Sequence, residues 1–234
     1  MNKNTPNKRS DLKLENKSLF VSRHGKLLLP YKDHSEMPFG IIADLASEKL
    51  NPPIDKAYCF ELINSISGKI PLDGIDEIRF SPSRRCRETA ISFSEFIRNN
   101  YSKIIPVIVM PKLKEIRFDL RKIHPLSEDG GFDIEDINNK VFQAMANGKD
   151  CEHVFDTYER VETTLRDLRL KNGHKKYLLI THDFFMRVME IYLKNKGLGN
   201  AAITYDTLKD TRRNGYLDGF ATDGSFSNLE FFEP

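Results

Sequence analysis

The sequence is poor in cysteine and has almost no excess of charge of either sign. Its three cysteines, Cys59, Cys86 and Cys151, are odd in number and lack Cys-x-x-Cys spacing. They predict neither a disulfide framework nor a zinc knuckle, and they favour a reduced, cytoplasmic setting. The 36 Lys and Arg residues against 34 Asp and Glu residues leave a formal net charge of +2, too small for the overall basicity of a nucleic-acid-binding protein. We therefore expect no nucleic-acid partner.

Long hydrophobic runs are absent as well. The longest, such as Tyr177–Ile180, are far below membrane-spanning length, and residues 1–17 lack the apolar stretch of a signal peptide. We expect no membrane partner. These first seventeen residues carry five basic and two acidic side chains without hydrophobic periodicity, which predicts a polar, flexible tail.

The rest of the chain has the composition of one globular domain. Of the 234 residues, 39% are hydrophobic and 30% are charged, which excludes collagen-like, coiled-coil and low-complexity chains. A chain of this length buries roughly 70 to 75% of the surface that its unfolded form exposes. Its core therefore needs no disulfide or metal, and we predict one domain over residues 18–234.

Short apolar runs alternate with helical patterns along this domain. Apolar residues recur at helical spacing from Cys86 to Ile97, and residues 184–193 predict a second, well-buried helix. This alternation predicts a three-layer α/β/α sandwich with a mostly parallel sheet. The run that contains Pro106 is expected at a sheet edge, or as a strand that starts late. The four predicted strands are Leu19–Val21, Glu77–Phe80, Ile104–Met110 and Tyr177–Ile180.

The remaining segments give weaker patterns. After a break at Gly130-Gly131, residues 134–146 and 152–170 predict two helices, the second with a clean apolar stripe. Residues 216–234 predict one or two edge strands and a turn at Asp223-Gly224.

Two histidines and two arginines stand where predicted strands end or a helix begins. His24 follows the first strand and His182 the fourth, while Arg23 precedes His24 and Arg85 starts the helix after the second strand. Ligands of open α/β sheets bind beyond the carboxyl ends of the strands, so we expect these four side chains to share one pocket. Two guanidinium groups and two imidazoles suit a phosphoryl group. Nearby arginines also lower an imidazole pKa, which keeps a nucleophile ready near pH 7.

Four sequence elements carry a family resemblance. Leu19–Gly25 resembles the Arg-His-Gly signature of the histidine phosphatase superfamily, the phosphoglycerate mutase-like proteins. Ser81–Ala90 resembles its Ser-Pro-x-x-Arg-x-x-x-Thr-Ala element. Leu113–Ile116 is similar to its Leu-x-Glu element, and Leu179–His182 to its final strand and histidine. The elements occur in the family's order.

The resemblance implies a role for each matching residue. His24 would be the nucleophile that becomes a phosphohistidine, and Arg23 and Arg85 would clamp the phosphate oxygens. His182 would add a further donor as charge develops. Glu115 would give a proton to the leaving oxygen and then take one from the attacking water. No metal or nucleotide cofactor is implied, and the sequence has neither a Walker-type loop nor a His-Glu-x-x-His motif.

The chain departs from the mutase branch of the family on either side of this pattern. There, Arg-His-Gly is followed by Glu or Gln, Thr and an Asn, but here by Lys26–Pro30. Lys26 either extends the positive site toward a larger anion or is a solvated loop residue. After the final His comes Asp183, which the acid-phosphatase and phytase branch uses as its proton donor, although a carboxylate at a helix start is also a plain N-cap. Both residues are candidate substrate-binding residues, and Asp183 is a second candidate for the acid.

Together these features predict a cytoplasmic, metal-independent phosphatase that acts on a small phosphorylated metabolite. A phosphoprotein is a weaker alternative substrate. The segment at about 121–172 is expected to lie over the active site, as inserted segments at this place do in relatives. Two other functions remain open: a phosphoryl mutase of the phosphoglycerate mutase type, disfavoured by Lys26–Pro30, and a catalytically weak regulator that binds a phosphorylated ligand.

Overall fold

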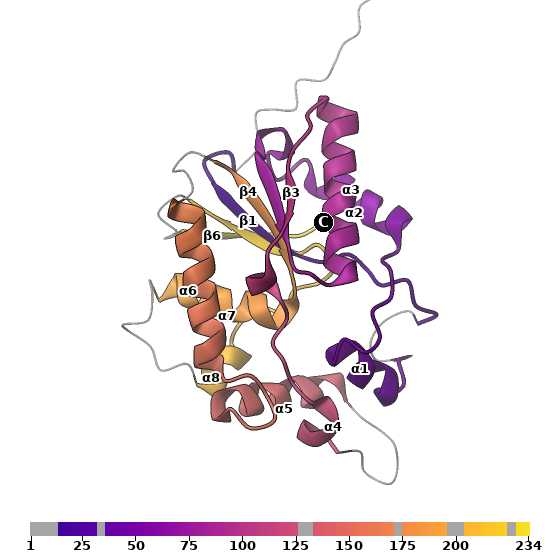
Figure 1. Ribbon diagram of the computed structural model, residues 1–234, viewed down its shortest axis with the longest axis vertical. Coiled ribbons are helices and arrows are strands. Elements are labelled where there is room, and N and C mark those ends of the chain that lie inside the picture. The colour runs from indigo at the N-terminus through magenta and orange to yellow at the C-terminus, as the bar shows by residue number, and fades with distance from the viewer. Residues whose placement is uncertain (1–13, 32–35, 126–132, 171–174, 196–203, 224–227) are drawn as a thin grey trace, which may run out of the picture.

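One six-stranded sheet organises the molecule (Figure 1). The computed structural model describes residues 14–31, 36–125, 133–170, 175–195, 204–223 and 228–234, without the side chains of residues 169 and 170. The strand order is β3-β2-β4-β1-β5-β6; β3, β2, β4 and β1 are mutually parallel, and β5 pairs antiparallel with both β1 and β6. The strands are β1 (Leu19–Arg23), β2 (Glu77–Phe80), β3 (Val107–Val109), β4 (Tyr177–Thr181), β5 (Gly219–Thr222) and β6 (Leu229–Phe232).

All four predicted strands are present. β3 is an edge strand that starts directly after Pro106, as expected because proline cannot donate to a strand ladder. The C-terminal segment supplies two strands, of which only β6 lies at an edge. Gly224, in the predicted turn, lies outside the described residues.

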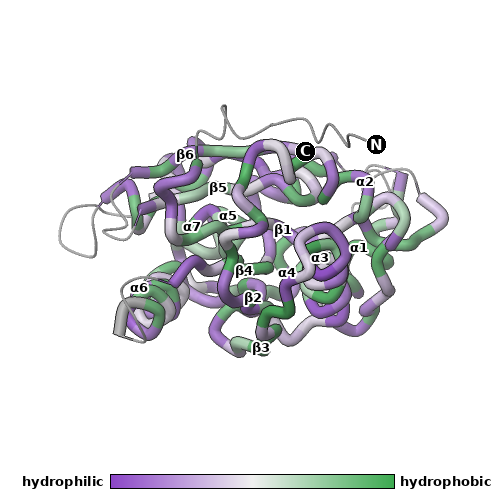
Figure 2. Tube along the Cα trace, turned by 90° about the horizontal axis from the view of Figure 1, so that it is seen from above, coloured by the Kyte–Doolittle hydropathy of each residue, from purple (hydrophilic) through white to green (hydrophobic). Residues whose placement is uncertain are grey.

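Helices cover both faces of the sheet. The alternation of β1 shows why: Leu19 and Val21 pack into one hydrophobic core, while Phe20, between them, packs into the other. Viewed from above, α2 and α3 lie on one side of the strands and α6 and α7 on the other (Figure 2). The helices are α1 (Phe39–Ala46), α2 (Lys56–Ile66), α3 (Arg84–Tyr101), α4 (Leu120–Ile123), α5 (Ile134–Asn147), α6 (Val154–Leu170), α7 (Asp183–Lys194) and α8 (Tyr205–Lys209).

The predicted three-layer α/β/α architecture is therefore confirmed. The helices predicted from residue patterns correspond to α3, α5, α6 and α7, and the apolar residues from Cys86 to Ile97 that define the α3 stripe are buried. The sequence interpretation missed α1, α2, α4 and α8. Asp55 caps α2 by accepting a hydrogen bond from the Tyr58 N–H at 3.1 Å, a start signal that the sequence contained.

The predicted insertion divides into two parts. In Figure 1, α4 and α5 lie with α1 beyond the lower ends of the strands. A segment that lies over the active site is expected there. By contrast, α6 packs against α7 in the layer beside the sheet. Only the first part of the 121–172 segment therefore lies at the sheet edge, and the break at residues 130 and 131 lies outside the described part of the chain.

The last residues of the predicted N-terminal tail, 14–17, are part of the folded domain. Leu14 and Lys17 are both buried, and the Lys17 ammonium forms an ion pair with Glu230 at 2.8 Å. Residues 14–17 therefore belong to the packed structure beside β6, whereas residues 1–13 lie outside the described residues. Among the described helices, none is both long enough and apolar enough to cross a membrane.

Candidate active site

Two histidines meet at the edge of the sheet where the parallel strands end. His24 follows β1 and His182 follows β4, its nearest parallel neighbour. Their ring centroids lie 5.4 Å apart with the ring planes at 65°. The structure therefore brings together the two imidazoles that the sequence placed after separate strands.

His24 is held as a neutral imidazole with one unprotonated ring nitrogen. Its Nδ1 lies 2.9 Å from the Gly25 carbonyl oxygen; a carbonyl can only accept, so Nδ1 carries the proton and Nε2 keeps its lone pair. The side chain is 5% exposed. Burial, followed by the charges of Arg85 and Arg23, holds the His24 pKa well below its ordinary value. These contacts leave the lone pair of Nε2 unprotonated at neutral pH.

Gly25 allows a close approach between two of the sequence elements. A Cβ at this position would lie 3.0 Å from Cys59 Sγ and 3.4 Å from Thr89 Oγ1. The Gly25 N–H donates to Thr89 Oγ1 at 2.9 Å, and that hydroxyl donates to the Arg85 carbonyl at 2.7 Å. The loop after β1 is thereby fixed to the first turns of α3.

His182 has the opposite tautomer. Arg85 Nε–H donates to its Nδ1 at 3.3 Å, so Nε2 carries the proton and donates to Ser81 Oγ at 2.9 Å. Burial is again the main cause of a His182 pKa well below its ordinary value, and the charges of Arg85, Arg23 and Arg160 add to it. A neutral His182 therefore lies beside a neutral His24.

Two guanidinium groups supply hydrogen-bond donors that find no acceptor within the described structure. Arg23 Nε and Arg85 Nη1 are both buried and lack a partner there. Arg23 is otherwise held by donation from Nη1 to the Asn214 carbonyl at 2.5 Å and by stacking of its guanidinium over Tyr216 at 5.0 Å. Unsatisfied buried donors are costly, so these two groups are well suited to an anion.

Glu115 lines the same cavity as Arg23, His24 and Arg85, and its carboxyl group is buried away from water. Burial raises the Glu115 pKa to about 7, even though Oε1 accepts hydrogen bonds from the Ile116 and Phe185 N–H groups, each at 3.0 Å. The negative charge of Asp183 also raises that pKa, and Arg85 opposes the rise. A carboxyl group with such a pKa can both give and take a proton near neutral pH.

A clamp on α6 fixes the segment that carries Glu115. Arg160 Nη1 donates to the Lys112 and Lys114 carbonyls, each at 2.9 Å, and its guanidinium lies 4.9 Å from the Phe185 ring centroid. Glu152 holds Arg160 through a 2.8 Å ion pair. The sequence interpretation missed both residues, because α6 showed only an apolar stripe and no local signal for this contact.

Asp183 neither caps α7 nor has the pKa of an acid near neutrality. The N-cap of α7 is His182, and Asp183 is the first helical residue. Its carboxylate instead forms a 3.1 Å ion pair with Arg187 and accepts from the Asn214 backbone and side-chain N–H groups at 3.0 and 2.9 Å. Burial alone would raise the Asp183 pKa, but Arg187, Arg23 and these hydrogen bonds together lower it. The N-cap interpretation was wrong, and the depressed pKa disfavours Asp183 as the proton donor.

Removal of Asp183 is expected to destabilise the protein. Asp183→Ala would leave Arg187, whose side chain is 5% exposed, without its countercharge, and breaking a buried pair costs about 3 to 5 kcal/mol. Asp44→Ala is the matched control, since it breaks the 2.8 Å pair with Arg121 between two much more exposed side chains, worth about 0 to 1 kcal/mol. Urea unfolding measures both changes in the free energy of unfolding. Equal losses in the two variants would contradict this description of Asp183.

Lys26 does not join the other candidates. Its ammonium lies 5.3 Å from the centroid of the Tyr58 ring on α2, and Lys26 does not line the cavity formed by the described residues. The structure therefore gives no support for the alternative in which Lys26 extends the positive site, and its role in binding stays a prediction. The direction of its side chain depends on α2, which the sequence interpretation had missed.

Five of the other predicted site residues line one cavity of about 130 Å³. His182 does not line it but contacts two residues that do, His24 and Arg85. The cavity lies between the sheet edge and the layer formed by α1, α4 and α5. Within the described part of the chain, no group of three or more His, Cys, Asp and Glu side chains is arranged to hold a metal ion. The polar side chains that line it at the sheet edge are Arg23, His24, Arg85, Glu115 and Asp183.

Comparison with known proteins gives one family match and many structural relatives. A model of the histidine phosphatase superfamily (branch 1) matches residues 66–208, a segment that contains Arg85, Glu115 and His182 but begins after Arg23 and His24. A comparison with curated protein sequences gives no match.

Solved structures resemble nearly the whole chain. YhfR of Bacillus stearothermophilus aligns with a TM-score of 0.55 and 16% identity over 92% of this chain and 94% of its own. The mycobacterial glucosyl-3-phosphoglycerate phosphatase aligns with a TM-score of 0.56 and 14% identity, over 93% of this chain and 97% of its own. The putative alpha-ribazole-5'-P phosphatase of Escherichia coli aligns with a TM-score of 0.53 and 16% identity, over 92% of this chain and 95% of its own. At these identities the likeness shows a shared fold.

Proposed function

The chain belongs to the histidine phosphatase superfamily (branch 1), and from this premise we propose that it is a phosphomonoester hydrolase that works through a phosphohistidine at His24. The observation that carries the proposal is a group of four side chains, three of which line one end of the cavity. In it, a neutral His24 with an unprotonated Nε2 lies beside His182. Arg23 and Arg85 each have a buried N–H group without an acceptor among the described residues, and these supply donors that a phosphoryl group needs.

The first step transfers the phosphoryl group to the protein. The lone pair of His24 Nε2 forms a bond to phosphorus while the bond from phosphorus to the leaving oxygen breaks. Arg23 and Arg85 donate hydrogen bonds to the phosphoryl oxygens as negative charge develops on them. The N–H of the neutral His182 donates to Ser81, and its Nδ1 accepts from Arg85. His182 would therefore position the Arg85 guanidinium rather than donate to the phosphoryl group as the sequence had predicted. Glu115, protonated, gives its proton to the leaving oxygen, so the alcohol departs neutral.

The second step returns the protein to its starting state. Water attacks phosphorus, Glu115 takes a proton from it, and the bond between phosphorus and Nε2 breaks to release inorganic phosphate. We propose that no metal takes part, because the guanidinium groups neutralise the phosphate charge and Glu115 handles the protons. A chelator should therefore leave the rate unchanged.

The substrate that we propose is a small phosphorylated metabolite. A cavity of about 130 Å³ is smaller than the roughly 300 to 1,000 Å³ of pockets that take drug-sized ligands, which favours a small molecule over a phosphoprotein. Phosphatases of small metabolites occur among the structural relatives. All three cysteines are free thiols, which suits the reducing cytoplasm that we propose as its location.

A screen of phosphorylated metabolites tests this function. Each reaction is analysed for free phosphate and for an isomer of the substrate in parallel. A hydrolase releases phosphate in amounts equal to the alcohol, with no isomer. Isomer formation without free phosphate would instead identify a mutase, and binding without turnover would identify a regulator.

A further inference from the structure

Most of the cavity lining is hydrophobic. Of its seventeen lining residues, five are the polar side chains at the sheet edge and ten are hydrophobic. The two others are Asn138, on α5, and Arg213, which is exposed. The hydrophobic wall includes Leu27, Ile42, Leu45, Leu120, Ile137 and Phe184.

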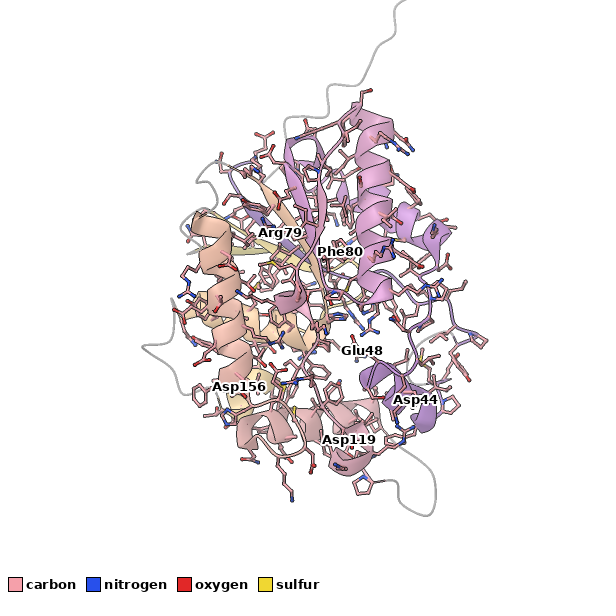
Figure 3. The ribbon with its side chains drawn as sticks, in the orientation of Figure 1. Asp44, Glu48, Arg79, Phe80, Asp119 and Asp156 are labelled. Carbon is pink, nitrogen blue, oxygen red and sulfur yellow. The ribbon has the colours of Figure 1, made fainter. Side chains whose placement is uncertain are left out.

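This wall is built by several elements that are fixed to one another. Ile42 and Leu45 come from α1, Leu120 from α4 and Ile137 from α5. Asp44 of α1 pairs with Arg121 of α4 at 2.8 Å, and Figure 3 shows Asp44 and Asp119 in the same layer below the sheet. The leaving group of a substrate bound at His24 would therefore meet apolar surface from three helices.

From this lining we propose that the enzyme acts on phosphomonoesters with a small apolar leaving group rather than on sugar or polyol phosphates; the inference rests on the proposed function. A leaving group rich in hydroxyls would lose water and find few partners here. A hydroxyl buried without a hydrogen bond costs about 1 to 3 kcal/mol. A methylene buried in the same place contributes about 0.8 kcal/mol in the opposite direction.

Two substrates of equal carbon number test the inference. n-Propyl phosphate and glycerol 1-phosphate are both primary alkyl esters and differ in two hydroxyl groups. We expect kcat/KM to be at least about ten-fold higher for the propyl ester, although glycerol is the better leaving group. Lengthening propyl to butyl should raise kcat/KM about four-fold, which is 0.8 kcal/mol converted at 1.36 kcal/mol per decade.

A pair of matched variants tests whether the hydrophobic wall causes the preference for the propyl ester. Ile137→Thr replaces an ethyl group of the cavity wall with a hydroxyl. Ile108→Thr makes the same change on the edge strand β3, where Ile108 is 42% exposed. The propyl-to-glycerol ratio should fall about ten-fold in Ile137→Thr and stay unchanged in Ile108→Thr. Because both substrates are compared in one preparation, partial misfolding does not alter the ratio.

The outcomes distinguish failure of this inference from failure of the proposed phosphatase activity. Equal or faster hydrolysis of glycerol 1-phosphate, or an unchanged ratio in Ile137→Thr, would overturn the apolar substrate class and leave the phosphatase intact. Absence of any phosphate release that depends on His24, from these esters or from an activated aryl phosphate, would overturn both.

Discussion

His24→Ala is expected to lower kcat/KM for an aryl phosphate by about four orders of magnitude or more. The replacement removes the atom that would bond to phosphorus, while Arg23 and Arg85 can still bind the anion. Binding of inorganic phosphate should therefore survive. The measurements are steady-state kinetics with the aryl phosphate and calorimetric titration of the variant with inorganic phosphate.

A second histidine provides the control for this loss. His153 is half-buried, stacks on Phe155 and does not line the candidate cavity formed by the described residues. His153→Ala should keep kcat/KM within about two-fold of the parent protein, the expectation for a site remote from the chemistry. Comparable rates for His24→Ala and the parent protein would rule out His24 as the nucleophile.

Glu115→Gln is expected to have the second-largest effect, and it should depend on the leaving group. Loss of the proton donor should lower turnover of alkyl phosphates by roughly two orders of magnitude or more, because an alkoxide leaves poorly without a proton. Aryl phosphates with activated leaving groups should keep nearly the parent kcat/KM, because this constant reports transfer to His24 and not the later step in which Glu115 is the base. The measurement is kcat/KM for a series of esters with leaving alcohols of rising pKa.

Asp183→Asn is the matched comparison for Glu115→Gln. Asp183 is bonded to Arg187 and Asn214, and its depressed pKa leaves no proton to donate at neutral pH. Loss of this carboxylate should lower the stability of the protein, and any loss of activity should be the same for all esters. A leaving-group-selective defect in Asp183→Asn, with none in Glu115→Gln, would move the acid to Asp183.

The pH profile should report the same carboxyl group. The donor must be protonated, and the Glu115 pKa is raised to about 7, so kcat/KM for alkyl phosphates should fall as pH rises above about 7. The His24 pKa lies well below its ordinary value, so protonation of the nucleophile should limit the rate only at more acidic pH. Glu115→Gln should lack the alkaline decline near pH 7. Its persistence in that variant would show that another group titrates there.

Local sequence patterns predicted the central part of this fold because the interactions that define it are local. Hydrophobic runs specified β1, β2 and β4, and a helical stripe specified α3. Since parallel strands end at one edge, the positions of His24 and His182 after their strands were enough to bring the rings together. No distant contact had to be guessed for that conclusion.

The features that the sequence did not reveal depend on partners far away in the chain. Lys26 turns toward Tyr58 of α2, and Asp183 is occupied by Asn214, from the segment before β5. Arg160 reaches the Lys112 and Lys114 carbonyls from the middle of an ordinary amphipathic helix. Lys17 is buried where β6 brings Glu230 to it. A composition or a periodicity contains no information about such pairings.

Chemical trapping of the intermediate tests the nucleophile most directly. The protein is mixed with a radiolabelled phosphomonoester, quenched within the first turnover in alkali, where a phosphohistidine survives, and digested for mass spectrometry. We predict one labile phosphoryl group per chain, attached to His24 and absent from His24→Ala. Rapid phosphate release with the label on another residue, or with no label on the protein at all, would contradict covalent catalysis by His24.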